Sequence, residues 1–322
     1  MKLEKVNWVS ITTRLWTSVN TASYLALTIH FWDDDSSILQ SFVLDCLRIK
    51  GRHTSLRLED ELRSILIKHE VMSKIVVGVI DNGANIVKAL RDIDIRQVPC
   101  YAHTLNLVAP GSIKDAPALI KVKDTASKIV EQTKRSPVVQ DKFEDIQRNR
   151  GHTRIKKLIQ DVPTRWNSTF EMMERLVELR GAVAELLTEL GMSTKVGVVD
   201  SNTWQVLGEA VEVLQPLFEG TLELSGEKLT TGSKAIPLTT MLMFRYDHLI
   251  EESDPGSIKC QLAKAIRGNP KRRFGALEDI TELAIATLLD PRFKVNGSQS
   301  SVKKDVAVEK LELVINMELQ KV

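Results

Sequence analysis

The sequence predicts an α/β domain built on a mixed β-sheet, followed by an all-α domain. Within the first hundred residues, short runs rich in β-branched and aromatic residues alternate with polar connections. Beyond residue 110 these runs give way to long segments whose apolar residues recur at helical spacing. We therefore expect residues 1–110 to form the sheet domain and residues 111–322 to form the helical domain.

Three strands are expected at the start of the chain. They cover residues 6–13, 24–32 and 39–47, and only short polar links separate them. Links of this length suit antiparallel hairpins, because parallel strands require a longer crossover connection. The three strands should therefore pair in order, each antiparallel to the next.

A crossover helix and a central strand follow. Apolar residues at helical spacing predict a helix over 56–69, and the continuous apolar run 75–80 predicts a strand buried on both faces. A second helix is expected over 82–90, with an edge strand over 97–99 and a helix from Tyr101. A right-handed crossover places the fourth strand beside the first, which outlines an RNase H-like mixed sheet. Arg14 should then lie beside Asp81, at the interstrand spacing of about 5 Å.

The second half of the chain is expected to be entirely helical. The predicted helices cover residues 170–190, 203–224, 237–250, 257–266, 279–289 and 302–317. Gly191 should end the first of these and Pro216 should kink the second. Asp290 and Pro291 should end the helix before them. Core positions are expected for four tryptophans, namely Trp8, Trp16, Trp32 and Trp204.

Composition narrows the class of protein but not its function. A hydrophobic fraction of 43%, a charged fraction of 27% and a net charge of +2 are typical of an ordinary globular protein. Such a mild charge does not by itself indicate nucleic-acid binding. Only Cys46, Cys100 and Cys260 are present, too few for a disulfide framework, and Cys100-x-x-His103 lacks a second ligand pair for zinc. No apolar run reaches the length of a membrane span, so no membrane association is expected.

Two basic stretches leave two interpretations open. They lie at residues 148–157 and at Lys271, Arg272 and Arg273. Charge runs are commonly solvated loops, and that interpretation is favoured here. The alternative is contact with phosphates, which would position a duplex without reading its sequence.

Eight segments, taken in order, resemble the hAT superfamily of DNA transposases, specifically the branch that gave rise to BED-type zinc-finger proteins. These segments are residues 12–18, 27–31, 53–54, 81–90, 100–107, 163–169, 224–228 and 286–294. The resemblance implies an RNase H-like catalytic fold interrupted by a helical insertion domain. Relative to that pattern, the chain is expected to lack the BED finger and to be truncated before the closing helix and the C-terminal dimerisation segment.

The resemblance also assigns the catalytic positions. Family enzymes use an Asp on the first strand, an Asp on the fourth strand and a Glu on a helix beyond the insertion. The fourth-strand acid maps onto Asp81, whereas the first-strand position holds Arg14. A two-metal site needs acidic ligands, and a guanidinium cannot lose its charge. We therefore expect Asp81 to be vestigial, with no metal or other cofactor, and Arg14 to pair with Asp81 or with a phosphate. Asp33, Asp34 and Asp35 should lie at the opposite edge of the sheet.

Four further residues are nucleic-acid-binding by this resemblance. Cys100 and His103 match a motif that shapes the active site and touches the transposon end; the alternative is a packed helix start with a buried thiol. Trp166, beside Arg165, matches a tryptophan that stacks on a displaced base. The alternative places Trp166 in the core and pairs Arg165 with a local acid, with Asn167, Ser168 or Thr169 capping a helix from residue 170.

These observations favour a catalytically inactive, hAT transposase-derived nuclear protein that associates with DNA or with protein, as a transcriptional regulator does. Its expected partners are DNA, a second copy of itself and related hAT-derived proteins. Two alternatives remain open. One is an active transposase or nuclease completed by a partner chain, and the other is a non-catalytic interaction module or gene remnant.

Overall fold

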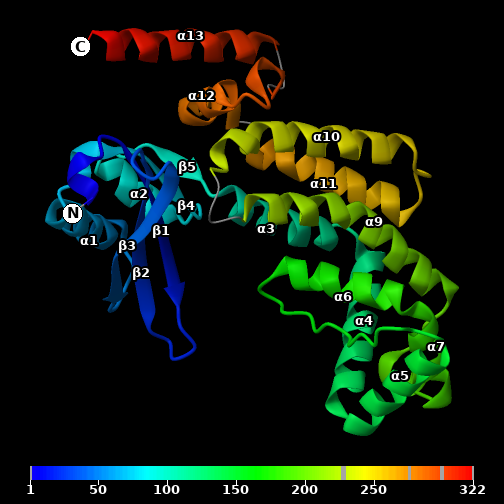
Figure 1. The fold of residues 1–322 in the computed structure, drawn as a ribbon. Coiled ribbons are helices and arrows are strands. Elements are labelled where there is room, and N and C mark those ends of the chain that lie inside the picture. The colour runs from blue at the N-terminus through cyan, green and yellow to red at the C-terminus, as the bar shows by residue number, and fades with distance from the viewer. Residues whose placement is uncertain (1, 226–229, 275–276, 298–300, 321–322) are drawn as a thin grey trace. The chain divides into compact units, whose positions relative to one another are not determined.

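The computed structural model describes residues 2–225, 230–274, 277–297 and 301–320 (Figure 1). The chain divides into two compact units. Unit 1 comprises residues 1–104, 226–235 and 277–322, and unit 2 comprises residues 105–225 and 236–276. The boundary expected near residue 110 therefore lies at 104/105. The expected assignment of all later residues to the helical domain differs from this division, because the chain returns to unit 1 twice.

Unit 1 is built on a five-stranded mixed sheet with the order β3-β2-β1-β4-β5. The strands are β1 (Val9–Thr17), β2 (Ser23–Asp33), β3 (Ile38–Ile49), β4 (Ile75–Ile80) and β5 (Gln97–Pro99). β1, β2 and β3 pair antiparallel, whereas β4 lies parallel to β1 and β5 lies parallel to β4. The predicted crossover and strand order are confirmed.

One face of the sheet forms the core of unit 1. Strand side chains alternate between faces, so the odd-numbered residues of β1 and β2 share the buried face. Helices α1 (Ser55–Lys68) and α2 (Ala84–Asp92) pack there and contribute their apolar faces. The side chain of Thr54 caps α1 by accepting a hydrogen bond from the Arg57 amide at 3.4 Å. β4 departs from its prediction, because only Gly78 and Ile80 are fully buried.

The other face of the sheet carries half-buried and exposed residues. Trp16 and Trp32 lie on this even-numbered face and are 38% and 52% exposed. Trp8, which precedes β1, is 55% exposed. The prediction that these three tryptophans pack in the core is therefore wrong, because an aromatic residue on a strand follows the alternation of its neighbours whatever its own hydrophobicity. Trp204 is buried, as predicted.

The C-terminal part of unit 1 is helical. It contains short 3₁₀ turns, α12 (Thr281–Leu289) and α13 (Ser301–Leu319). A salt bridge of 2.7 Å joins Arg96, at the start of β5, to Glu282 on α12. Asp290 ends α12 as expected, and its carboxylate accepts hydrogen bonds from the Arg292 guanidinium, which hold the pKa of Asp290 well below its usual value.

Unit 2 is an all-α domain. Its helices are α4 (Pro117–Arg135), α5 (Pro137–Asn149), α6 (Trp166–Glu178), α7 (Arg180–Glu189), the one-turn α8 (Ser193–Val196), α9 (Ser201–Leu224), α10 (Ala235–Glu251) and α11 (Ile258–Phe274). Helix α3 (Tyr101–Lys114) begins in unit 1 and continues into unit 2. α4 and α5 were not predicted individually. The single helix expected over 170–190 is divided at Leu179 into α6 and α7.

The core of unit 2 is aromatic at its centre. Phe170 and Phe218 stack with ring centroids 4.5 Å apart. The ring of Tyr246 is fully buried and its hydroxyl donates to the Val213 carbonyl at 2.9 Å. Burial raises the pKa of this hydroxyl, which keeps it a neutral donor. Gly191, with φ of +56°, ends α7 in the left-handed conformation that its sequence position predicted.

Within the described ranges, none of the helices combines the length and the apolar character that a membrane crossing requires. Of the segments that carried the family resemblance, residues 226–228 lie outside the described residues.

We expect the substitution Leu27→Ala to destabilise unit 1 by about 2–5 kcal/mol, because it empties a fully buried position on the central face of β2. Urea unfolding followed by circular dichroism measures this change. Val43→Ala, at a position that is 65% exposed on the neighbouring strand, is the matched control and should change the unfolding free energy by less than about 0.5 kcal/mol. Equal losses in the two variants would contradict the assignment of the buried face.

Candidate functional site

The end of the sheet beside β1 and β4 holds the predicted catalytic positions. The parallel ladder between these strands extends to the pair Thr12 and Val79. Arg14 and Asp81 each lie two residues beyond that pair, so the register directs them to the same face of the sheet. Arg14 is exposed and Asp81 is half-buried. The predicted juxtaposition of the two positions is thus consistent with the observed register.

The two side chains do not form an ion pair in the part of the chain that the structure describes. A carboxylate oxygen of Asp81 instead accepts a hydrogen bond from the Gly83 amide at 3.3 Å. Of the two expectations for Arg14, the ion pair with Asp81 is not observed, and the contact with a phosphate stays a prediction. The consequence is that the Arg14 guanidinium is directed to solvent and has no carboxylate partner among the described residues.

The loop after β4 is tied to the start of α3. Asn82 has a φ of +65°, a conformation that asparagine tolerates better than most residues. The side-chain amide of Asn82 donates to the Thr104 hydroxyl at 3.3 Å, and that hydroxyl donates to the Cys100 carbonyl at 2.9 Å. The Cys100 amide donates in turn to the Ile80 carbonyl at 2.7 Å. These bonds bring Asp81, Cys100 and His103 to one edge of the sheet.

Cys100 and His103 are both half-buried at this edge. Cys100 precedes α3, and His103 lies on its first turn. The alternative of a fully buried thiol is not what the structure shows, because Cys100 retains partial exposure. Sequence reasoning missed Asn82 and Thr104, which position the helix start. The asparagine directly after a buried strand was the available signal.

A histidine on the even-numbered face of the sheet was also missed. The two ring nitrogens of His30 each lie 3.0 Å from a hydroxyl oxygen, Nε2 from Thr12 and Nδ1 from Ser41. This chain of hydrogen bonds joins β1, β2 and β3 across the face. Burial lowers the pKa of His30, because the partly desolvated ring disfavours the charged form.

Trp166 and Arg165 lie in unit 2. Trp166 is 3% exposed and meets Phe218 edge-on, with ring centroids 6.4 Å apart. Its indole N–H is buried and has no acceptor among the described residues. Arg165 is exposed and forms no ion pair there. In this conformation Trp166 is a core anchor, as one of the two interpretations has it, while the local acid which that interpretation assigned to Arg165 is not found among the described residues.

The loop before Trp166 is held by Asp161, a residue that sequence reasoning did not single out. Its side chain is 7% exposed and lies 3.1 Å from the Lys123 ammonium on α4. It also accepts hydrogen bonds from Ser168 at 3.2 Å and Thr169 at 2.8 Å. Helix α6 begins at Trp166, not at 170, so these hydroxyls lie inside the helix and reach back to the loop. The predicted cap is replaced by this network.

The basic stretch 148–157 is largely neutralised by neighbouring acids. Arg148 pairs with Glu144 and Asp145, Arg150 pairs with Glu185, and Lys156 pairs with Glu178. These contacts support the interpretation of a solvated loop with local ion pairs. The side chains of Lys271, Arg272 and Arg273 lie outside the described residues, so neither interpretation of that stretch is tested.

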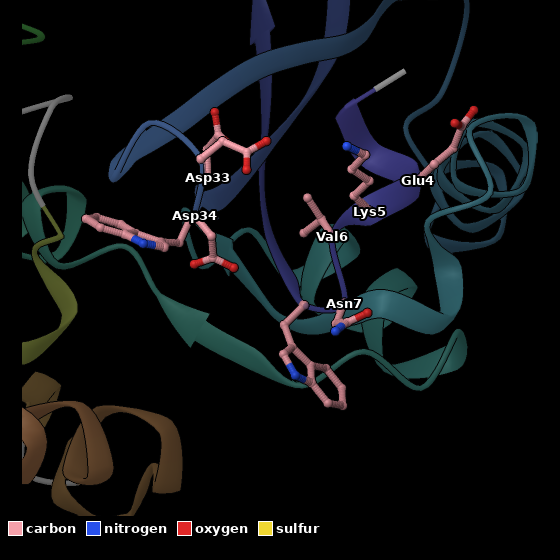
Figure 2. Close-up of a pocket in the computed structure, with 9 residues that line it drawn as sticks. Glu4, Lys5, Val6, Asn7, Asp33 and Asp34 are labelled. Atoms are coloured by element: carbon pink, nitrogen blue, oxygen red, sulfur yellow. The ribbon is translucent and has the colours of Figure 1, made fainter.

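The acidic run after β2 lines an open depression of about 840 Å³ together with residues 4–8 (Figure 2). Figure 2 shows Asp33 and Asp34 opposite the segment that carries Glu4, Lys5, Val6 and Asn7. Asp33 is buried and accepts a hydrogen bond from Ser36 at 2.7 Å. Because β1 and β2 are antiparallel, this depression lies at the far end of the sheet from Arg14, as predicted. Within the described ranges, no three His, Cys, Asp or Glu side chains are grouped to hold a metal ion.

Comparison with known proteins places this architecture in a class. Residues 12–99 match the family described as the ZBED1 RNase-like domain, and residues 98–213 match the ZBED1 RNase-like helical domain. Together the two matches span more than half of the 322 residues. The fold and these matches define a protein with an RNase-like sheet interrupted by a helical domain.

Three relatives identify the family more closely. The chain is 27% identical over 317 residues to zinc finger BED domain-containing protein 4 of Homo sapiens, which covers 95% of this chain and 26% of that protein. It is 28% identical over 308 residues to the putative AC transposase of Zea mays, covering 88% of this chain and 36% of the relative. It is 26% identical over 268 residues to the putative transcriptional regulator tpeD of Talaromyces stipitatus, covering 71% of this chain and 31% of that protein. The chain belongs to the hAT transposase-derived family of BED-type proteins.

The chain spans about a quarter to just over a third of the length of these relatives. The matched part includes the sheet edge with Arg14, Asp81, Cys100 and His103, and the helical segment with Arg165 and Trp166.

We expect the stability of unit 1 to fall as the pH is lowered through and below about 6.5. The pKa of His30 is lower in the folded state than in the unfolded state, so the unfolded chain binds the proton first as the pH falls. The stability that the neutral His30 ring contributes is therefore fully present above the pKa of the unfolded chain and is lost as the pH falls below it. Urea unfolding between pH 8 and pH 5 measures the slope. His30→Gln should flatten it, whereas the same substitution at the exposed His248 should not. Identical slopes in both variants would refute this expectation.

We expect Asp161→Ala to destabilise unit 2 by about 3 kcal/mol, because it leaves the part-buried Lys123 ammonium without its carboxylate and the Thr169 hydroxyl without its acceptor. Thermal or urea unfolding measures the change. Asp145→Ala removes a carboxylate that is 62% exposed and paired with Arg148, and should cost less than about 1 kcal/mol. A difference of less than 1 kcal/mol between the two variants would show that the loop is not held by this network.

Proposed function

We propose that this chain is a transposase-derived protein that associates with DNA in the nucleus without cutting it. Membership of the hAT-derived family supports the association with DNA, since the names of its relatives include a transposase, a BED zinc-finger protein and a transcriptional regulator. Action on DNA also places the protein in the nucleus. The partners we propose are DNA and a second copy of this chain or a related hAT-derived protein.

The loss of catalysis is supported above all by the guanidinium at position 14. Metal-assisted phosphodiester chemistry requires acidic ligands that neutralise the charge of the metal ions and fix their geometry. Extension of the β1–β4 register by two residues beyond Thr12 and Val79 would put Arg14 beside Asp81, where the resemblance calls for the first-strand carboxylate. A permanent positive charge there opposes a dication, so Asp81 is left as a vestigial ligand.

The same guanidinium is suited to a different task. Exposed arginines without carboxylate partners bind phosphates through paired N–H donors. Arg14 in unit 1 and Arg165 in unit 2 both meet this description among the described residues. Cys100 and His103, at the sheet edge beside Asp81, complete the contact with the nucleic-acid backbone that the resemblance implies. The contacts we propose therefore bind DNA without activating it.

Trp166 is proposed as a base-stacking residue that leaves its buried position when DNA binds. Its indole N–H is buried without an acceptor among the described residues, which costs about 1–3 kcal/mol. Rotation towards solvent would recover part of that cost, and a base would replace the contact with Phe218. We therefore propose two conformations of Trp166, one buried in the free protein and one stacked on a base in the complex with DNA.

A pair of substitutions tests the loss of catalysis. Arg14→Asp restores the carboxylate that the family pattern requires, whereas Arg14→Asn removes the charge without adding a ligand. We expect Arg14→Asp to bind Mn²⁺ about tenfold or more tightly than Arg14→Asn, because affinity for hard cations follows the charge of the ligands. Isothermal titration calorimetry with the metal alone measures the difference. The wild-type chain should not cleave a labelled duplex in Mg²⁺ or Mn²⁺.

Two outcomes would overturn the proposal. Metal-dependent cleavage by the wild-type chain that disappears in Asp81→Asn would identify an active nuclease, including one completed by an added partner chain. The absence of any salt-dependent retention of the chain on DNA would instead favour a protein-interaction module, since phosphate contacts release counterions and weaken as salt rises.

A further inference from the structure

Four side chains lie together on the even-numbered face of the sheet. Of these four, only Arg14 has a role in the function proposed above. This hairpin patch consists of Arg14, Trp16, Tyr24 and Arg48. Directly opposed residues of antiparallel strands project to the same face. The observed pairs are Trp16 with Tyr24, Tyr24 with Arg48, and Arg14 with Ala26. The register therefore gathers all four side chains at the hairpin end of β1, β2 and β3.

The two aromatic rings of the patch form a stacked pair. Their centroids are 5.7 Å apart and their planes are inclined by 23°. Trp16 is 38% exposed, so part of its ring remains available to another surface. The ladder between β1 and β4 ends at Thr12 and Val79, whereas β1 continues to Thr17. The edge of Trp16 that faces away from Tyr24 thus has no neighbouring strand.

The charges of the patch point to an anionic partner. Arg14 and Arg48 are both exposed, and neither forms an ion pair within the described ranges. The nearest acid along β3, Asp45, lies opposite Leu27 on the other face and binds Lys68 at 3.4 Å. The two arginines are separated by two strand spacings across β2 and by two residues along the strands, because Cys46 is the β3 residue in line with Arg14, so their backbones lie roughly 12 Å apart. An extended polyanion fits this spacing better than a single phosphate.

We propose that the hairpin patch binds single-stranded nucleic acid. Trp16, supported by Tyr24, offers a ring face on which an unpaired base stacks, while Arg14 and Arg48 contact the phosphates on either side of that base. A duplex does not satisfy the patch, because its bases are already stacked on one another and do not expose a ring face. This inference deepens the proposed association with DNA and rests on it, and it assigns Arg14 a binding partner in place of the metal ion.

The test uses the full chain and fluorescein-labelled oligo(dT), oligo(U) and a mixed-sequence duplex of equal length, with binding followed by fluorescence anisotropy at several salt concentrations. We expect tighter binding to the single strands than to the duplex. Trp16→Leu should weaken single-strand binding roughly 5- to 150-fold, whereas Trp16→Phe should retain most of it. Arg14→Ala and Arg48→Ala should each reduce the slope of log K against log salt by about 0.7, the value for one phosphate contact.

Matched controls come from the same unit. Trp32→Leu removes an exposed tryptophan at the far end of the same face, and Arg63→Ala removes an exposed arginine that pairs with Glu59 on α1. Neither should change single-strand binding, and circular dichroism verifies that all variants are folded. Cys46, exposed opposite Ala26, provides a second readout. Its alkylation by iodoacetamide should slow when oligo(dT) is bound.

The outcomes separate this inference from the proposed function. Nucleic-acid binding that is insensitive to Arg14, Trp16 and Arg48, or that favours the duplex, would overturn the hairpin patch and leave the association with DNA intact. Binding at the patch by a chain that also cleaves DNA would overturn the proposed loss of catalysis and leave the patch intact. Failure to bind any of the three probes would overturn both. Tighter binding to oligo(dT) than to oligo(U) would identify DNA as the bound strand, and the reverse order would identify RNA.

Discussion

The parallel pairing of β1 with β4 is the constraint on which the functional part of this molecule depends. It joins the first strand of the chain to a strand that begins 58 residues after β1 ends, since β1 ends at Thr17 and β4 begins at Ile75. Such pairing requires the intervening hairpins and helix α1 to form a right-handed crossover. Once the register of Thr12 with Val79 is set, the positions of Arg14 and Asp81 follow from it. If β4 shifted by one residue relative to β1, the side chains of Arg14 and Asp81 would lie on opposite faces of the sheet.

Much of unit 1 could be predicted from its sequence because its signals are local. Strand β4 was predicted at its observed bounds, since a continuous apolar run between polar residues has few alternatives. The hairpins and the crossover helix follow from short polar links and helical spacing. The exposed tryptophans could not be predicted in the same way, because hydrophobicity alone does not reveal which face of a sheet lacks a covering layer. Alternation with Leu25, Leu27 and Ile29 along β2 contains that information for Trp32.

The helical half was harder to predict, for two physical reasons. Helix boundaries depend on contacts between distant parts of the chain, as when Asp161 holds Ser168 and Thr169 and helix α6 begins earlier than its expected cap. The second reason is that the return of the chain to unit 1 depends on contacts between distant residues. The ion pair between Arg96 and Glu282, for example, links residues 186 positions apart. For the candidate site, the strand order expected from the sequence puts Arg14 and Asp81 at the same end of the sheet, as the observed register does, whereas the roles of Cys100 and His103 stay predictions. The sequence left open whether Trp166 lies in the core, which is where the structure has it, and it did not reveal that Arg14 forms no ion pair among the described residues.

The proposed replacement of an acid by Arg14 would change what this end of the sheet recognises as well as what it catalyses. A carboxylate at this position binds phosphodiesters only through a metal ion, whereas a guanidinium binds them directly. The surrounding features suit direct binding, because the stacked Trp16 and Tyr24 and the unpaired Arg48 lie on the same face. Asp81 is compatible with direct binding, since its carboxylate accepts a hydrogen bond from the Gly83 amide. Under this proposal, a single substitution removes a metal ligand and adds a phosphate contact on the same sheet.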